Sequence, residues 1–236
     1  MTKKFSKIIF MLTVIGIFSS SGIFAQPYGG ADFVSRYIWR GLEINKSFNV
    51  QPSFGYGAGG FDIGLWGSYA ISDVENTLQS EIDLYASYTI STSGGDFAIL
   101  FTDYYFPDGN VRLGDFDDGT GAHTIELGIG YAGPSSFPIA VSVYMNVYND
   151  AGNNAYFEIG YPVSLPDDYS MDLFVGATAG SSENPAYYGT DKFGFLNVGF
   201  KVSKDIVLTD SFSIPAFVLF TSNPTADNAY ICLLYT

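Results

Sequence analysis

The sequence has almost none of the residues that build disulfides and zinc sites. Of its 236 residues, one is a cysteine, Cys232, and one is a histidine, His123. A disulfide within the chain needs two cysteines, and a structural zinc site needs four ligands that are mostly Cys or His. Neither feature is therefore available, no cofactor is expected, and Cys232 is expected to be an inert, small apolar residue.

Positive charge is also scarce. The chain has 10 basic residues against 24 acidic ones, a net charge of −14, and only 14% charged residues in all. Nucleic acid is not expected as a partner, because binding to its phosphates relies on clustered Lys and Arg. Low charge with 47% hydrophobic residues also excludes a disordered chain. What is abundant is Tyr, Phe and Gly, at 18, 21 and 27 residues, a composition typical of β-strands and tight turns.

Long hydrophobic runs are missing after the first 25 residues. Three lysines near the N-terminus precede an apolar run over 8–17, and small residues lead up to Ala25. This pattern predicts a secretory signal peptide over 1–25, cleaved after Ala25, and leaves one domain over 26–236. The alternative is an uncleaved membrane helix, for which the apolar run is short against the ~20 residues that a span needs.

An exported chain without helical spans is either soluble or an outer-membrane β-barrel. The chain after residue 25 repeats a two-residue hydrophobic period, as in 124–131, where apolar side chains alternate with Thr, Glu and Gly. Such alternation indicates strands with one apolar and one polar face. We expect an all-β fold, a single antiparallel transmembrane β-barrel of about twelve strands. The expected strands are 31–40, 48–56, 61–66, 81–88, 96–105, 124–131, 139–147, 157–163, 171–178, 192–202, 212–221 and 227–235.

The lengths of the connections give a second indication. Every other connection is short, namely 57–60, 91–95, 133–137, 165–169 and the longer 203–211. The remaining set includes the two longest, 106–121 and 181–191. Short turns on one side and long loops on the other are typical of transmembrane barrels, with the turns in the periplasm.

Aromatic residues lie beside the short turns. They are Tyr56, Phe61, Tyr88, Phe97, Tyr131, Phe137, Tyr161, Phe200, Phe212 and Tyr235. We interpret them as a belt at one membrane interface. The opposite belt is expected to contain Tyr37, Trp39, Phe48, Tyr69 and Phe193.

Charged residues in the polar phase of the strands are expected to face the lumen. They are Arg36, Arg40, Asp62, Glu81, Asp83, Glu126, Glu158, Asp172 and Lys201. Asp172 and Lys201 fall on neighbouring strands and are expected to pair. Two interpretations remain open: a charged constriction that selects solutes, or a polar network that fills a narrow barrel. Twelve strands lie between eight, which leave a filled interior, and sixteen, which leave a channel.

Five large residues are also expected to point inward and take up volume. They are Trp66, Tyr85, Tyr144, Tyr156 and Phe174.

One loop is a weak candidate for a metal site. Asp115, Asp117 and Asp118 form its densest acidic patch, and Asp108 and Asp150 are expected nearby. Hard cations take six to eight oxygen ligands, but the distant Glu of an EF-hand is absent. A solvated surface turn is the alternative.

His123 is the one candidate for an enzymatic role. Its phase places it toward lipid, near the outer interface, where a barrel phospholipase carries a Ser–His pair. Such a pair needs an outward Ser at the same depth on a neighbouring strand, and the sequence offers no convincing one. We therefore expect an interfacial polar residue, and a protein that is not an enzyme.

Three motifs carry a resemblance to a known family. They are Ser35-Arg36-Tyr37-Ile38-Trp39-Arg40-Gly41, Gln51-Pro52-Ser53 and Gly64-Leu65-Trp66-Gly67-Ser68-Tyr69, with weaker echoes at Asp103-Tyr104-Tyr105 and Glu126-Leu127-Gly128. The chain resembles the TorF-like (Gcw_chp) family of uncharacterised bacterial outer-membrane proteins, most strongly over 31–71. The resemblance implies an outer-membrane barrel with a porin-like channel as its candidate activity, and carries over no catalytic residues.

The chain departs from outer-membrane barrels at its C-terminus. Such barrels usually end in an aromatic residue that the assembly machinery recognises, whereas this sequence ends Leu234-Tyr235-Thr236. Two explanations remain open: the C-terminal end is altered, or recognition relies on Tyr235.

The leading functional expectation is passive passage of small solutes, with a weak preference for cations or neutral solutes because of the acidic excess. A filled barrel with a structural or surface-interaction role is the main alternative, followed by an interfacial lipid-acting enzyme and a soluble secreted β protein. The expected partners are membrane lipids, the outer-membrane assembly machinery and small solutes, and the expected location is the bacterial outer membrane.

Overall fold

The computed structural model describes residues 26–74, 77–109, 111–182, 187–210 and 212–235. Its strands form a closed antiparallel barrel, and β2 and β3 form a separate two-stranded sheet. Among the described residues there is no helix long and apolar enough to cross a membrane. The predicted signal peptide lies outside the described residues.

The barrel strands are β1 (Gln26–Val34), β4 (Asn49–Ala58), β5 (Phe61–Ala70), β6 (Ser80–Thr92), β7 (Gly95–Tyr105), β8 (His123–Ala132), β9 (Ala140–Tyr148), β10 (Ala155–Ser164), β11 (Ser170–Thr178), β12 (Gly194–Thr209), β13 (Phe212–Asn223) and β14 (Asn228–Tyr235). The other elements are β2 (Tyr37–Trp39), β3 (Leu42–Asn45) and the short 3-10 helix η1 (Pro107–Gly109).

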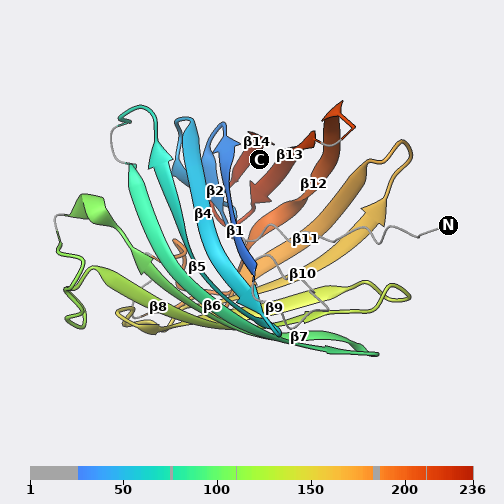
Figure 1. Cartoon of the computed structure of the whole chain (residues 1–236). Helices are drawn as coiled ribbons and strands as arrows, with labels where there is room; N and C mark the ends of the chain where they lie inside the picture. The colour runs from blue at the N-terminus through green and yellow to red at the C-terminus, as the bar shows by residue number, and fades with distance from the viewer. Residues whose placement is uncertain (1–25, 75–76, 110, 183–186, 211, 236) are drawn as a thin grey trace.

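The barrel follows the order of the chain, with the two terminal strands meeting at the seam. Figure 1 shows the strands side by side, from β4 in light blue through β8 in green to β12 and β13 in orange and red. The seam is short, because β1 and β14 pair at Phe33↔Tyr235 and Val34↔Leu234. Ser35 lengthens it by donating its backbone N–H to the carbonyl of Leu233, at 2.9 Å. The prediction of a closed barrel of about twelve strands is confirmed.

Alternation along the strands sorts side chains into an inner and an outer set. On β6, Glu81, Asp83 and Tyr85 are buried, whereas Leu84 and Tyr88 are exposed. Successive residues of a strand point to opposite faces of its sheet, so the polar phase faces the lumen and the apolar phase faces outward. This is the reverse of a soluble protein, in which the apolar phase is the buried one.

The two ends of the barrel differ in their connections. We call one end the turn end, which carries the connections 59–60, 93–94, 133–139, 165–169 and 210–211. The loop end carries 35–48, 71–79, 106–122, 149–154, 179–193 and 224–227. The predicted connection 203–211 is wrong in extent, since β12 continues to Thr209. Its final residues pair with β13, as at Val207↔Ser213.

The predicted first strand, 31–40, is wrong. The barrel strand is β1, which pairs with β4 over nine residues from Gln26↔Gly57 to Val34↔Asn49. Residues 37–45 form the β2–β3 hairpin instead. Pro27, Gly29 and Gly30 conceal β1, because proline and glycine are poor strand formers. The alternation of 37–40 belongs to a hairpin that turns inward.

The aromatic residues beside the turns lie on the outer face. Exposed side chains are found at Tyr56, Phe61, Tyr88, Phe97, Phe137, Tyr161, Phe200, Phe212 and Tyr235. The hydroxyl of Tyr131 donates to the carbonyl of Gly94 in a neighbouring turn, at 2.7 Å. At the loop end, Phe48, Tyr69 and Phe193 are exposed, but Tyr37 and Trp39 are buried. Their assignment to an outer belt is wrong, because the hairpin carries both rings into the lumen.

Candidate functional site: a plugged lumen

The β2–β3 hairpin lies inside the barrel. Its turn consists of Arg40 and Gly41, with φ angles of 50° and 76°. Two residues with positive φ make the kind of turn that matches the twist of paired strands. Asn223 fixes this turn against β13 by donating its side-chain amide to the carbonyl of Gly41, at 3.2 Å. The hairpin therefore carries Arg40 on its tip into the lumen.

Arg40 is held by a carboxylate, a hydroxyl and aromatic rings, and its buried Nε has no hydrogen-bond partner among the described residues. Its guanidinium donates two hydrogen bonds to the Glu126 carboxylate on β8, at 2.6 and 2.9 Å. A third goes to the hydroxyl oxygen of Tyr188, at 2.7 Å. The guanidinium carbon also lies 4.3 Å from the ring centroid of Tyr144 and 4.6 Å from that of Tyr156. A two-pronged bond to a carboxylate combined with ring faces is the environment that suits arginine best.

The Arg40–Glu126 pair is charged and almost completely buried. The two side chains are 2% and 1% exposed. Burial alone would lower the pKa of Arg40, but the neighbouring Glu126 carboxylate outweighs it, so the pKa lies above its ordinary value. Burial also raises the pKa of the Tyr188 hydroxyl, which stays protonated. The hairpin is thus held by an ion pair whose separation would leave an uncompensated buried charge.

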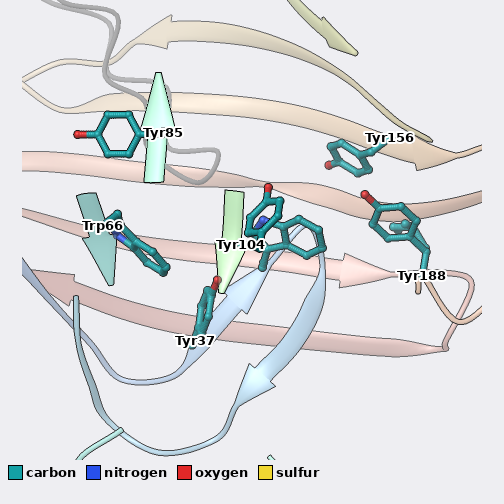
Figure 2. Close-up of a cluster of buried hydrophobic side chains, with 8 residues drawn as sticks. Tyr37, Trp66, Tyr85, Tyr104, Tyr156 and Tyr188 are labelled. Atoms are coloured by element: carbon teal, nitrogen blue, oxygen red, sulfur yellow. The ribbon is translucent and has the colours of Figure 1, made fainter. Parts of the chain in front are cut away.

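Aromatic rings pack around this pair and fill the surrounding lumen. Figure 2 shows Tyr156 and Tyr188 on one side of the cluster and Trp66 and Tyr85 on the other. The buried members are Tyr37, Trp39, Trp66, Tyr85, Tyr104, Tyr156, Tyr188 and Leu196. We call the β2–β3 hairpin together with Tyr187 and Tyr188 the plug. The two tyrosines come from the connection 179–193. Tyr188 stacks on Trp39 at 5.9 Å between ring centroids, and Tyr187 meets Trp39 edge to face at 6.2 Å.

The predicted lumen residues all lie inside the barrel or on the hairpin, but they divide into separate groups. Arg36 pairs with Glu43 on the hairpin itself, at 2.7 Å. On the wall, Lys201 pairs with Asp172, at 3.2 Å between Nζ and Oδ2. The predicted lumen residues therefore do not form the single ring of charge that a selective constriction would require.

Two further groups hold the remaining acidic residues. Asp62 accepts a hydrogen bond from the Tyr28 hydroxyl, at 2.7 Å. The Glu81 carboxyl lies in hydrogen-bonding contact with Tyr37 of the hairpin and with Asp83. The Asp83 Oδ1 atom is buried and has no hydrogen-bond partner among the described residues. Glu81 therefore gives the hairpin a second polar contact with the wall, beside that of Arg40.

A cavity of about 110 Å³ lies between the hairpin and the wall. Strands β10 to β14 supply most of its lining, with Glu158, Lys201 and Leu219 among the side chains. Asp172, which also lines it, is the third residue of β11 counted from the turn end. The cavity is the part of the lumen that the plug leaves unfilled on this side.

His123 lies on the outer face, under the connection 106–122. Its Nδ1 lies 2.8 Å from Asp103 Oδ1 and its Nε2 lies 2.6 Å from the carbonyl of Leu113. The ring of Phe116 stacks on it at 3.9 Å. Both ring nitrogens thus face acceptors, and neither faces a hydroxyl. These contacts indicate that His123 has a structural role, holding the connection 106–122 against β7 and β8.

The acidic loop does not converge on one point. Asp115 accepts a hydrogen bond from the backbone of Asp117, at 3.1 Å, while Asp118 is exposed. Asp108 accepts from the backbone of Gln79 and Ser80. Asp150 accepts from Asn146, at 2.8 Å. Within the described ranges, no three His, Cys, Asp or Glu residues are placed to hold a metal ion.

Comparison with known proteins assigns the chain to a family. The model of a family of bacterial proteins of unknown function (Gcw_chp) matches residues 27–229. This match covers most of the chain, so the protein belongs to that family. No curated protein matches the sequence.

Proposed function

We propose that the protein is an outer-membrane β-barrel of the filled kind, closed to free solute flow by its own plug. The outer face supports the location. Its exposed residues include Phe54, Leu65, Ile99, Leu127, Ile129, Ile159 and Ile231. Such a continuous apolar band suits lipid tails and is unfavourable in water. Membrane lipids are accordingly the partner that this face implies.

A charge in the middle of this band tests the location. Leu127, the fifth residue of β8, is 47% exposed. Leu127→Arg is expected to destabilise the barrel folded into lipid vesicles by about 2–4 kcal/mol, the cost of Arg at the bilayer midplane. The free energy of unfolding is measured by titration with urea, and the gel shift between unheated and boiled samples reports the folded fraction.

Leu113→Arg is the matched control. Leu113 is 62% exposed but lies in the connection 106–122, outside the strands. Its substitution should change stability by less than about 0.5 kcal/mol, as surface substitutions usually do. Equal effects of the two substitutions would place the band outside lipid and refute the proposed location.

The closed lumen rests on one observation, the burial of Arg40 against Glu126 inside the barrel. A diffusion porin keeps its centre water-filled, whereas here an ion pair, the plug and the surrounding rings occupy it. Passage of small solutes, the leading expectation from the sequence, would require the hairpin to leave this position. The eight buried tyrosine, tryptophan and leucine residues of the cluster described above make the hairpin a structural part of the lumen.

Conductance across planar bilayers decides between a closed and an open lumen. The intact protein is expected to give no channel steps. Val34 and Asn49 are directly paired, so Ser35 and Phe48 can be joined by Asn-Gly in place of residues 36–47 to make a tight hairpin. This variant is expected to give steps.

Lys46→Gln serves as the control, because it alters an exposed charge in the same connection and should leave the lumen closed. Steady channel steps from the intact protein would refute the filled barrel and favour a porin-like function.

A further inference from the structure

Two buried carboxyl groups of the barrel wall meet where the wall contacts the hairpin. Glu81 and Asp83 lie two residues apart on β6, so their side chains point to the same face, and they are 4% and 2% exposed. The Glu81 carboxyl is in hydrogen-bonding contact with Asp83 and with Tyr37 of the hairpin, and Tyr187 of the plug acts electrostatically on Tyr37. An ionised carboxyl group only accepts hydrogen bonds. Contact between two of them therefore requires a proton on one.

The neighbouring strands do not supply that proton. On β5, Ser68 lies opposite Glu81, but its hydroxyl donates to the Asn49 side chain, at 3.4 Å. On β7, the hydroxyl of Tyr104 donates to Glu126, at 2.9 Å. The proton of each hydroxyl is therefore already used in another hydrogen bond. The contact between the two carboxyl groups of β6 must carry a proton of its own.

Positive charge that could compensate two carboxylates is also absent from this contact. Among the described residues, the ion pairs within 4.0 Å involve neither Glu81 nor Asp83. Glu126 on β8 and Asp103 on β7 act on Asp83 as further acidic groups, and their own partners are Arg40 and His123. The Oδ1 atom of Asp83 is buried without a hydrogen-bond partner. Two adjacent charges here would be desolvated and unpaired, which favours retention of one proton by the pair.

We propose that Glu81 and Asp83 share one proton in the plugged barrel, and that its removal at alkaline pH loosens the hairpin. This inference rests on the proposed function, because it concerns the closure of the lumen. On removal, the carboxyl O–H bond breaks, the proton passes to a base in the solvent, and two like charges are left in contact beside Tyr37. If the hairpin leaves, water can solvate both carboxylates. The plugged barrel thus binds one more proton than the released one, so a rise in pH favours release.

A double variant without the titratable pair tests the shared proton. Glu81→Gln with Asp83→Asn keeps the shape of both side chains and removes both carboxyl groups. The equilibrium constant for unfolding in urea is measured by tryptophan emission, with the full-length protein folded in lipid vesicles, from about pH 5 to about pH 9, above the range in which free carboxyl groups ionise. Relative to the variant, the constant of the intact protein should rise by up to about tenfold per pH unit, and by at least about tenfold in all. A ratio that does not change with pH would overturn the proposal.

Asp205→Asn is the matched control, because it removes an exposed carboxyl group on β12. The ratio between the intact protein and this variant should stay constant over the same pH range. If the double variant fails to fold, Asp83→Asn alone replaces it, since its amide donates to Glu81 without a titrating proton. The same rise in ratio is then expected, and a constant ratio again counts against the shared proton.

A second comparison tests whether the proton acts through the hairpin. In the barrel with Asn-Gly in place of residues 36–47, Tyr37 is gone and water reaches the wall. Both carboxyl groups then ionise in the folded barrel as they do in the unfolded chain. Glu81→Gln with Asp83→Asn in this background should therefore give a ratio that does not depend on pH. A rise as large as that of the intact protein would show that the proton stabilises the wall alone, and would refute its role in holding the plug.

These results are separable from the test of the closed lumen. Channel steps from the intact protein at about pH 7 would refute the filled barrel itself. A lumen that is closed at this pH, combined with a ratio independent of pH, refutes only the shared proton.

Discussion

Arg40→Ala is expected to destabilise the barrel by about 3–5 kcal/mol, the cost of removing one member of a buried ion pair. The loss comes mainly from Glu126, whose side chain is 1% exposed. Without the guanidinium, its carboxylate keeps the Tyr104 hydroxyl as a donor, at 2.9 Å. One neutral donor does not offset the desolvation of a charge, so the hairpin and the wall around it lose stability together.

Tryptophan fluorescence offers a direct readout of this change. Trp39 and Trp66 are the two tryptophans of the chain, and both are buried in the lumen. Trp39 lies on the hairpin, so release of the hairpin exposes it to water and shifts its emission to the red. Urea unfolding of the folded barrel, followed by this emission, gives the free energy and the position of the hairpin in one experiment.

Two further variants separate charge from packing. Glu126→Gln in the Arg40→Ala background is expected to recover at least about 1 kcal/mol, because the amide is neutral and still accepts from Tyr104. Arg36→Ala removes a partly exposed ion pair and should cost less than about 1 kcal/mol. A loss below about 1 kcal/mol for Arg40→Ala itself, with unchanged emission, would show that the ion pair does not hold the hairpin.

The strands of the barrel wall were predictable from sequence because polar and apolar side chains alternate along them with a regular period. Alternation with a period of two assigns each strand residue to one face, and it placed Glu81, Glu126 and Glu158 toward the lumen without any knowledge of contacts. Strand direction and register add pairs on neighbouring strands, such as Asp172 and Lys201. These properties depend on a few consecutive residues, which the sequence displays directly.

The contents of the lumen were not predictable in the same way. The segment 37–40 alternates like a barrel strand, and rings such as Trp39 suit either lipid or a packed interior. The dipeptide Arg40-Gly41 was the available signal, since a Gly-containing pair between short apolar segments favours a two-residue turn. Tyr188 reaches Arg40 from 148 residues further along the chain. No local sequence pattern encodes such a long-range contact, so the plug could not be predicted from the sequence alone.

Gly41→Ala is expected to have an effect as large as that of Arg40→Ala, for a steric reason. Gly41 has a φ of 76°, a conformation that costs a residue with a side chain about 1–2 kcal/mol. A methyl group there would also overlap the backbone carbonyl oxygen of Leu196. That oxygen belongs to β12 and cannot rotate away, so the hairpin itself must move. We expect a loss of about 3 kcal/mol or more, the strain and the overlap combined.

Gly59→Ala is the control that separates the cost of the steric overlap from the cost of the backbone conformation. Gly59 also has a positive φ, at 58°, but no atom lies within 4 Å of the added methyl group. It lies in the β4–β5 turn and should cost only about 1–2 kcal/mol for its backbone conformation. Gly41→Ala should in addition shift the emission of Trp39 to the red and produce channel steps, whereas Gly59→Ala should do neither. Equal losses in the two variants, with a closed lumen in both, would mean that the hairpin accommodates the methyl group and that close contact with β12 does not fix its position.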